Sequence, residues 1–208
     1  MAFGEGVVAM KEYLAVAALL AFGVGVASAK QDGATLQSAE ETSSAEMARL
    51  FEEDQTDRTA APGKSIDWEQ VGMRDEVRER RVKELIHSGA LRTGADYFHA
   101  AMVLQHAPEP DDYLLAHDLC VIAIGTGEQR AKWLAAASLD RFLMAIGRPQ
   151  RFGTQFISRR SFHPPRLAPV DPNIPDQLRR ELNVPSLEEA KTREAEMRKD
   201  FEARRRAN

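Results

Sequence analysis

An aspartate inside the most apolar helix that the sequence predicts is the first residue to examine for chemistry. Asp140 shares a helical face with Trp133, Ala137 and Met144, because these positions repeat at intervals of three and four residues. A carboxylate within an apolar stripe must find a partner or stay neutral. Donors and acceptors follow in the turn around Gly153: Arg148, Gln150, Arg151, Thr154 and Gln155. Polar chemistry is therefore expected where this helix meets this turn.

Further polar residues in earlier segments would satisfy Asp140 and one another if the fold brought them together. The predicted cluster consists of Asp54 and of the predicted ligand-binding residues Gln55, Arg58, His106, Asp140, Arg141, Gln150, Thr154 and Gln155. One interpretation is a buried polar network that fixes how the helices meet the turn. The other is a ligand pocket, in which His106 and Asp140 are candidate catalytic acid and base and Arg58 or Arg141 binds an anion.

The sequence contains none of the common catalytic motifs. Ser138 lies in the middle of a predicted helix and not on a G-x-S-x-G turn, and no phosphate-binding loop occurs. The lone G-x-G at Gly125–Gly127 has no strand before it and is interpreted as a helix stop. His99 and His106 share a helix face, but no H-E-x-x-H and no cysteine cluster accompanies them. We therefore predict neither a metal nor a cofactor.

Composition limits the kinds of partner. The chain of 208 residues has a formal net charge of -4 and no basic stripe with interleaved aromatic residues, so no nucleic-acid partner is expected. The single cysteine, Cys120, lies among Leu119, Val121 and Ile122 and is predicted to be a buried, unreactive thiol. Because one cysteine cannot form an intrachain disulfide, stability is expected to come from the hydrophobic core.

The N-terminal segment is typical of a secretory signal peptide. An apolar run from Tyr13 to Val26 is followed by the small residues Ala27, Ser28 and Ala29, which suit signal peptidase. The run is shorter than the roughly 20 residues of a membrane span, so no stable span is expected after cleavage. The alternatives are an uncleaved anchor or a buried helix, and the sequence offers two start codons, Met1 and Met10. The predicted location is periplasmic or secreted.

The pattern of apolar residues and turns predicts a mostly α fold, a compact antiparallel helical bundle or helical-hairpin array with a short β segment after the fifth helix. Core helices are expected to begin at Ser43 and at Asp67 or Asp75, and then to span Thr93–Ala107, Asp112–Ile124 and Glu128–Ile146. The predicted segments are 1–29 (signal peptide), 30–42 (disordered leader), 43–160 (helical core domain), 161–185 (Pro-rich extended connection with a short helix) and 186–208 (charged C-terminal helix).

Two predicted helices carry mixed charges. The first holds the basic residues Arg74, Arg78, Arg80, Arg81 and Lys83 among glutamates, and we interpret it as a solvated face, with an anion site as the alternative. On the C-terminal helix, Glu189 with Arg193, Glu194 with Arg198 and Asp200 with Arg204 are spaced as i, i+4 ion pairs. That helix is expected to be exposed, and a partner-binding or dimer helix is the alternative.

Four short motifs in order resemble a family of uncharacterised bacterial proteins, a domain of unknown function with the pattern D-Q-x-x-R, Q-H, D-R and Q-x-[YF]-G-T-Q. The matching segments here are Asp54–Arg58, Gln105–His106, Asp140–Arg141 and Gln150–Gln155. The resemblance implies a mostly helical domain with one shared polar site and no established reaction. The helical pair from Tyr113 to Phe142 also resembles a single tetratricopeptide or Sel1-type hairpin, with small residues where the helices cross.

Two functions from different classes are compatible with these residues. The first is an exported, non-catalytic helical module that binds a small ligand, a peptide or an envelope component in a polar pocket. The second is a hydrolase-like enzyme that uses His106 and Asp140 as an acid–base pair. An open cleft beside the polar residues favours binding, and an enclosed contact favours a purely structural role.

Export gives the first testable prediction. N-terminal sequencing of the protein recovered from the periplasm or the medium is expected to begin at Lys30, because Ala27 and Ala29 occupy the two positions that signal peptidase reads. Recovery of the chain from the cytoplasm with residues 1 to 29 intact would contradict this.

Overall fold

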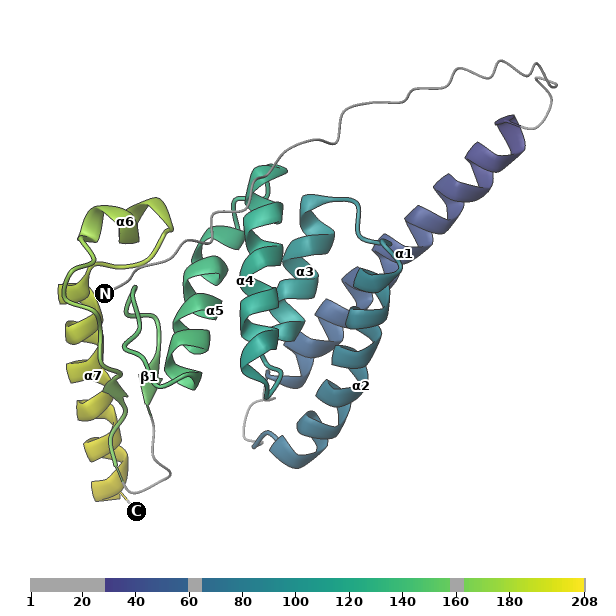
Figure 1. Cartoon of the computed structure of the whole chain (residues 1–208). Coiled ribbons are helices and arrows are strands. Elements are labelled where there is room, and N and C mark those ends of the chain that lie inside the picture. The colour runs from purple at the N-terminus through teal and green to yellow at the C-terminus, as the bar shows by residue number, and fades with distance from the viewer. Residues whose placement is uncertain (1–28, 60–64, 158–162, 208) are drawn as a thin grey trace, which may run out of the picture.

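The computed structural model describes residues 29–59, 65–157 and 163–207 of the chain, and nearly all of the predicted signal peptide lies outside them. The structure confirms a mostly helical fold with a short β segment after the fifth helix (Figure 1). The elements are α1 (Ala29–Asp57), α2 (Trp68–His87), α3 (Gly94–Leu104), α4 (Pro110–Gly125), α5 (Ala131–Ala145), β1 (Phe156–Ile157), β2 (Arg166–Leu167), α6 (Asp176–Glu181) and α7 (Leu187–Ala207). None of the helices in the described ranges is long and apolar enough to cross a membrane.

The first layer of the fold is a bundle of α1 to α5, and all five helices contribute buried side chains to its core (Figure 1). The α4–α5 hairpin packs closely because its facing positions are alanines. Ala116, Ala123, Ala131 and Ala135 are all buried, as the sequence predicts. Small side chains let two helix backbones approach, and larger residues such as Leu104 and Leu134 fill the space on either side.

Helix starts follow local capping chemistry. Asp67 accepts a hydrogen bond from the Gln70 N–H and begins α2, which settles the choice between Asp67 and Asp75. Thr93 and Asp96 form a reciprocal capping box at the start of α3. The predicted box at Ser186 is also present, since the Glu189 carboxylate accepts from both the backbone N–H and the hydroxyl of Ser186.

The first helix is longer than predicted. We expected a disordered leader over 30–42 and a helix start at Ser43, but α1 already begins at Ala29. The leader contains Ala, Gln and Glu, residues that cost little in a helix, and it contains no proline after position 29. The capping-box motif at Ser43 therefore does not mark the start of α1, because no proline precedes it to stop the helix from extending back to Ala29. The first turns of α1 extend beyond the other helices (Figure 1).

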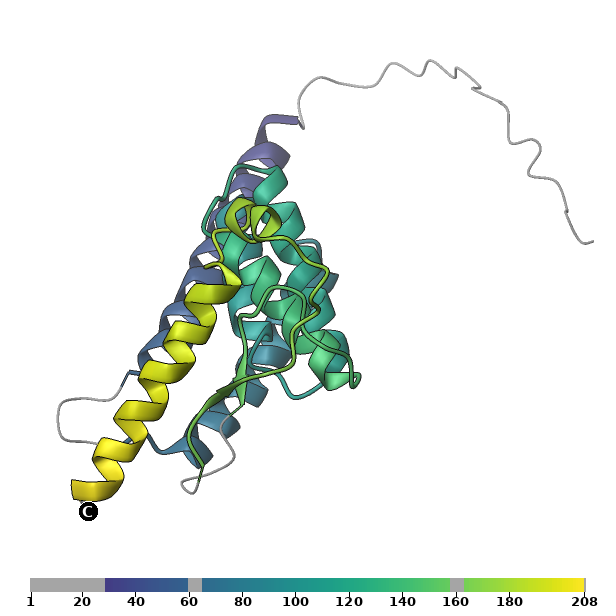
Figure 2. The same cartoon turned by 90° about the vertical axis from the view of Figure 1, so that its left-hand side faces the viewer.

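The second layer consists of β1, β2, α6 and α7, which cover the outer side of α5 (Figures 1 and 2). The predicted hairpin is present, with Phe156 opposite Leu167 and Ile157 opposite Arg166 in an antiparallel pair. A small second core joins this layer to α5 and consists of Ala136, Phe152, Ile174 and Val184. The long α7 lies on the outside with mostly exposed side chains, as its thin apolar edge predicts.

Cys120 lies in the bundle core and is fully buried, as predicted. Burial raises the pKa of its thiol to about 12, because the thiolate would be desolvated there. The thiol therefore stays protonated at neutral pH and unreactive in the folded protein.

Candidate functional site

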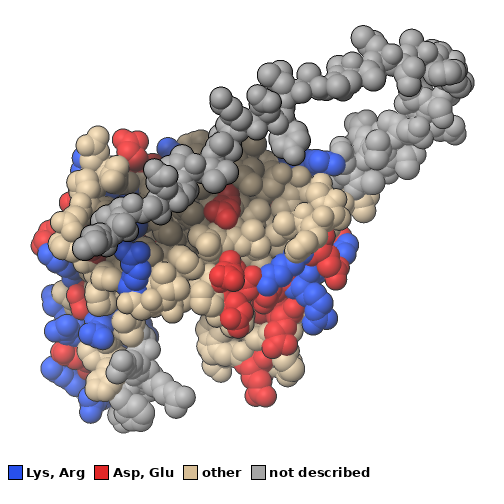
Figure 3. Space-filling view, in the orientation of Figure 1, with Lys and Arg blue, Asp and Glu red and all other residues tan. Residues whose placement is uncertain are grey.

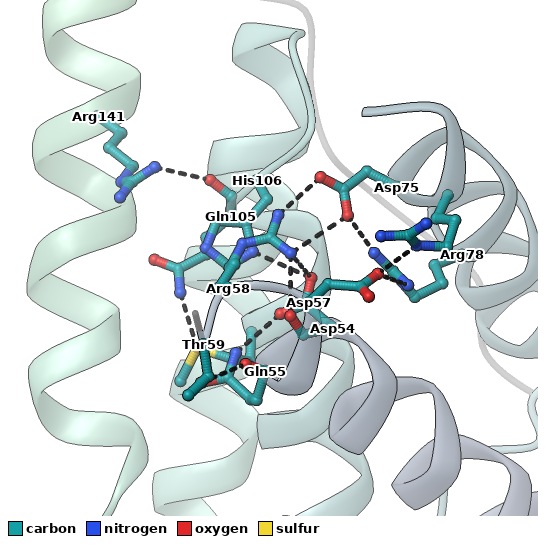
Figure 4. Close-up of polar contacts among 12 residues, drawn as sticks. Asp54, Gln55, Asp57, Arg58, Thr59, Asp75, Arg78, Gln105, His106 and Arg141 are labelled. Atoms are coloured by element: carbon teal, nitrogen blue, oxygen red, sulfur yellow. Dashed lines mark hydrogen bonds and ion pairs between the residues drawn. The ribbon is translucent and has the colours of Figure 1, made fainter. Parts of the chain in front are cut away.

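The structure divides the predicted polar cluster into two groups at different joints of the fold. Asp54, Gln55, Arg58, His106 and Arg141 lie where the end of α1 meets the ends of α3 and α5 (Figure 4). Asp140, Gln150, Thr154 and Gln155 lie where α5 meets the turn that leads to β1. Asp140 and Arg141 are neighbours in sequence, but consecutive residues of a helix point in different directions.

Asp54 is the centre of the first group, and its side chain is completely buried. Its Oδ1 lies 2.8 Å from Nη1 of Arg58 and 3.2 Å from Nδ1 of His106. Its Oδ2 accepts a hydrogen bond of 2.7 Å from the Gln55 amide. These donors replace the water that the carboxylate loses on folding, and they tie α1 to the end of α3.

A ladder of ion pairs continues from Arg58 into α2 (Figure 4). Nη2 of Arg58 lies 2.7 Å from Oδ2 of Asp75, whose other oxygen lies 2.6 Å from Arg78. Arg78 also pairs with Asp57 at 2.7 Å, and the exposed Arg74 pairs with the same oxygen. Arg58 is thus shared between two carboxylates, which leaves little of its positive charge for the anion that we expected it to bind.

The predicted solvated basic face on α2 is wrong at Arg78, because only 4% of the surface of this residue is exposed. Burial by itself would lower the pKa of Arg78, but the hydrogen bonds that Arg78 donates to Asp75 and Asp57 raise its pKa above the ordinary value. Asp57 shows the matching effect, since its hydrogen bonds with Arg74 and Arg78 lower its pKa. The helical spacing of these charges could not reveal the burial, which depends on α1 lying against α2.

His106 pairs with Asp54 and not with Asp140, the partner that the sequence favoured. Since an ionised carboxylate can only accept, Nδ1 is the donor in this contact. The His106 side chain also lines a cavity of about 220 Å³ between α2 and the α3–α4 turn. The other polar residues of this cavity are Asp75, Glu76 and Glu79. Charge on the walls of this cavity is therefore mainly negative.

Arg141 reaches the same joint from α5. Its Nη1 donates a hydrogen bond of 3.0 Å to the backbone carbonyl of Gln105 (Figure 4). Its Nε is buried and has no hydrogen-bond partner among the described residues. Burial lowers the pKa of Arg141, the nearby charge of Arg58 lowers it further, and Tyr113 opposes this. Arg141 thus holds α5 against the end of α3 at an electrostatic cost.

Asp140 is the centre of the second group and is also completely buried. It accepts hydrogen bonds from the backbone N–H groups of Arg151, Phe152 and Thr154 at 2.7, 3.0 and 3.1 Å. The Thr154 hydroxyl donates a further bond of 2.8 Å. The carboxylate therefore organises the turn after α5, and both of its oxygens already accept hydrogen bonds within that turn.

The glutamines close the same turn through the backbone. Gln150 donates to the carbonyls of Gln155 and Ala168, and its oxygen accepts from the Gln155 N–H at 2.9 Å. Gln155 donates to Thr154 at 2.9 Å and to the carbonyl of Ala137 at 3.4 Å. We expected these amides to satisfy Asp140 and Arg141 directly, but they bond to backbone groups and to the Thr154 hydroxyl. Gly153 takes a φ of +82°, as the turn requires.

Arg179, the arginine that completes this joint from α6, was not among the predicted site residues. It is 1% exposed and donates to the carbonyls of Phe152, Ile174 and Arg151, with Asp176 as its ionic partner at 2.9 Å. Its helix, Asp176–Glu181, is polar at every position except Leu178, so only the tertiary fold shows that three carbonyls converge on Arg179. Together, Asp140 and Arg179 supply the acceptor and the donors that the turn backbone needs.

Comparisons of the chain with protein families, with curated proteins and with solved structures found no match. The resemblance to the bacterial family of unknown function therefore stays a prediction based on its four motifs.

Asp140→Ala tests the second joint. We expect a loss of about 2–4 kcal/mol in the free energy of unfolding, because the substitution strands buried N–H groups of the turn. Urea denaturation measures it, and Asp118→Ala, an exposed position on α4, is the control. A variant as stable as the parent would show that the turn does not depend on this carboxylate.

Proposed function

We propose that this protein is an exported, non-catalytic binding module and that its ligand carries a positively charged organic group, an ammonium or a guanidinium. The supporting observation is the cavity beside His106, whose polar walls are Asp75, Glu76 and Glu79. Export rests on the apolar run from Tyr13 to Val26 and the small residues before Lys30.

Glu76 is the best-placed residue to receive the ligand. It is exposed and makes no hydrogen bond or ion pair with any other residue in the described ranges. Asp75 already pairs with Arg58 and Arg78, and Glu79 pairs with Lys83 at 2.6 Å. A cation that enters the cavity would therefore meet one free carboxylate and two partly neutralised ones.

An acidic patch, bordered by basic side chains, lies beside the cavity where α2 runs beside the start of α4 (Figure 3). In the first turn of α4, Asp111 is exposed, whereas Asp112 is buried and pairs with Lys83 at 2.6 Å. A field of one sign raises the local concentration of an oppositely charged ligand and speeds its association. It also opposes an anionic ligand at this end of the bundle.

An organic cation fits the cavity better than a bare divalent ion. Such an ion needs several free carboxylate, carbonyl or imidazole ligands in one shell. Asp75 and Glu79 are engaged by arginine and lysine, and one imidazole nitrogen of His106 is engaged by Asp54. An ammonium or guanidinium group needs only hydrogen-bond acceptors, which partly engaged carboxylates still provide.

Glu76→Gln tests this proposal. With Nα-acetyl-arginine amide and spermidine as probes, calorimetry is expected to show a dissociation constant about tenfold higher for the variant, a change of about 1.4 kcal/mol. Binding to the parent is also expected to weaken as ionic strength rises. Glu196→Gln, an exposed glutamate on α7, is the matched control. Binding of acetyl-aspartate in place of the cations would contradict the proposal.

A second candidate function is hydrolysis, with His106 as general base. The observation in its favour is the contact of 3.2 Å between His106 and the buried Asp54, which orients the ring at the edge of the cavity. This pairing replaces the His106–Asp140 pair that the sequence suggested.

His106→Asn separates the two candidates. If the protein is a hydrolase, it is expected to turn over an Nα-acyl-arginine ester, and the variant is expected to lose turnover while it still binds the amide probe. Failure of the parent to release the alcohol from this ester, while it binds the amide, would remove hydrolysis and leave binding.

A further inference from the structure

A second pocket lies between α5, the turn around Gly153 and the start of α7. Its volume is about 180 Å³, and its walls include Trp133, Thr154, Phe156, Val184, Glu189 and Arg193. The pocket is smaller than the roughly 300–1,000 Å³ of sites for drug-sized ligands, so its ligand would be small. The buried network around Asp140 fixes its floor, because Thr154 belongs to both.

Two opposite charges line this pocket without pairing. Glu189 and Arg193 are one helical turn apart on α7, in the order that favours an ion pair, and the sequence predicted that pair. The structure shows otherwise: in the part of the chain that it describes, no ion pair joins them. Glu194 and Arg198, the next such pair on the helix, do contact each other at 3.8 Å.

Each of the two charges has a different neighbour that holds it in place. Oε2 of Glu189 accepts from the backbone N–H and the hydroxyl of Ser186, both at 2.7 Å, which lowers the pKa of Glu189 and keeps it ionised. The guanidinium of Arg193 lies over the ring of Phe156, 5.6 Å from its centroid. A carboxylate and a guanidinium are thus kept apart at one small pocket.

The remaining wall of the pocket is apolar. The large indole of Trp133 on α5 is 40% exposed, although the sequence placed it on the buried face with Asp140. Phe156 and the buried Val184 and Ala190 lie around the same space. An aromatic side chain beside a pocket and half open to solvent offers contact area to a ligand at little conformational cost.

We propose that this pocket binds a small zwitterion, a free α-amino acid with an apolar side chain. Its ammonium group pairs with the free oxygen of Glu189, and its carboxylate pairs with Arg193. The apolar side chain packs against Trp133 and Phe156. A free amino acid is the simplest molecule that carries both charges a few ångströms apart together with an apolar group. The site is separate from the acidic cavity beside His106.

The test uses the fluorescence of Trp133 in full-length protein that carries Trp68→Phe, which leaves Trp133 as the sole tryptophan. The probes are L-leucine, N-acetyl-L-leucine, which lacks the ammonium charge, and L-leucinamide, which lacks the carboxylate. Leucine is expected to change the fluorescence saturably, and each blocked derivative is expected to bind at least about tenfold more weakly.

Charge variants assign each contact. Arg193→Gln is expected to reduce leucine binding to the level of leucinamide while leucinamide binding stays unchanged. Glu189→Gln is expected to reduce leucine binding to the level of N-acetyl-leucine, while the binding of N-acetyl-leucine stays unchanged. Arg198→Gln on the same helix is the matched control and is expected to change nothing. Adding Glu76→Gln is also expected to change nothing, so failure here is distinguishable from failure of the cation site.

Two results would overturn the proposal. One is the absence of a saturable change in Trp133 fluorescence up to the solubility limit of leucine. The other is equal binding of leucine and its blocked derivatives, which would show an apolar pocket that does not recognise the two charges. In the second case Arg193→Gln would also bind leucine like the parent.

Discussion

Two completely buried carboxylates, Asp54 and Asp140, set the conditions that the rest of the structure satisfies. A buried charge is tolerated only when enough donors replace its water, and those donors must come from other parts of the chain. Asp54 is bound by Gln55 from its own helix, by Arg58 from the turn just after that helix and by His106 from the α3–α4 turn. Asp140 collects three backbone N–H groups and a hydroxyl from the turn after α5. Each carboxylate thereby fixes one joint between elements distant in sequence.

This constraint also decides which polar residues remain for function. Asp140 has all of its hydrogen bonds inside the fold, and Arg58 divides its charge between Asp54 and Asp75. In the sequence, such residues look like those of an active site, because charged side chains are rarely buried unless they are paired. Here Asp140 and Arg58 have mainly a structural role. The groups that remain for a ligand line the two pockets, where Glu76, Glu189 and Arg193 are exposed to solvent.

Local chemistry made much of the fold predictable. Caps at Asp67 and Ser186, the alanines of the α4–α5 hairpin and the positive φ of Gly153 each depend on residues close in sequence. Partner choice was not predictable in the same way, because it depends on how helices lie against one another. From the sequence, Asp140 and His106 could be recognised as residues that are costly to bury unpaired. The prediction that they pair with each other was wrong, because His106 contacts Asp54. Arg78 and Arg179 were missed because their own segments are polar, and burial came from α1 and from the turn at Phe152.

Tertiary neighbours decide which charged side chains stay unpaired and able to meet a ligand. A local rule predicts an ion pair between Glu189 and Arg193, as it does between Glu194 and Arg198, and only the latter forms. The difference lies in tertiary neighbours: Ser186 engages Glu189, and Phe156 engages Arg193. Such neighbours hold charged groups apart before a ligand arrives, which lowers the entropy lost on binding. A fold that satisfies its buried charges internally can keep its pocket walls rigid and leave the opposed charges at the rim open to an incoming molecule.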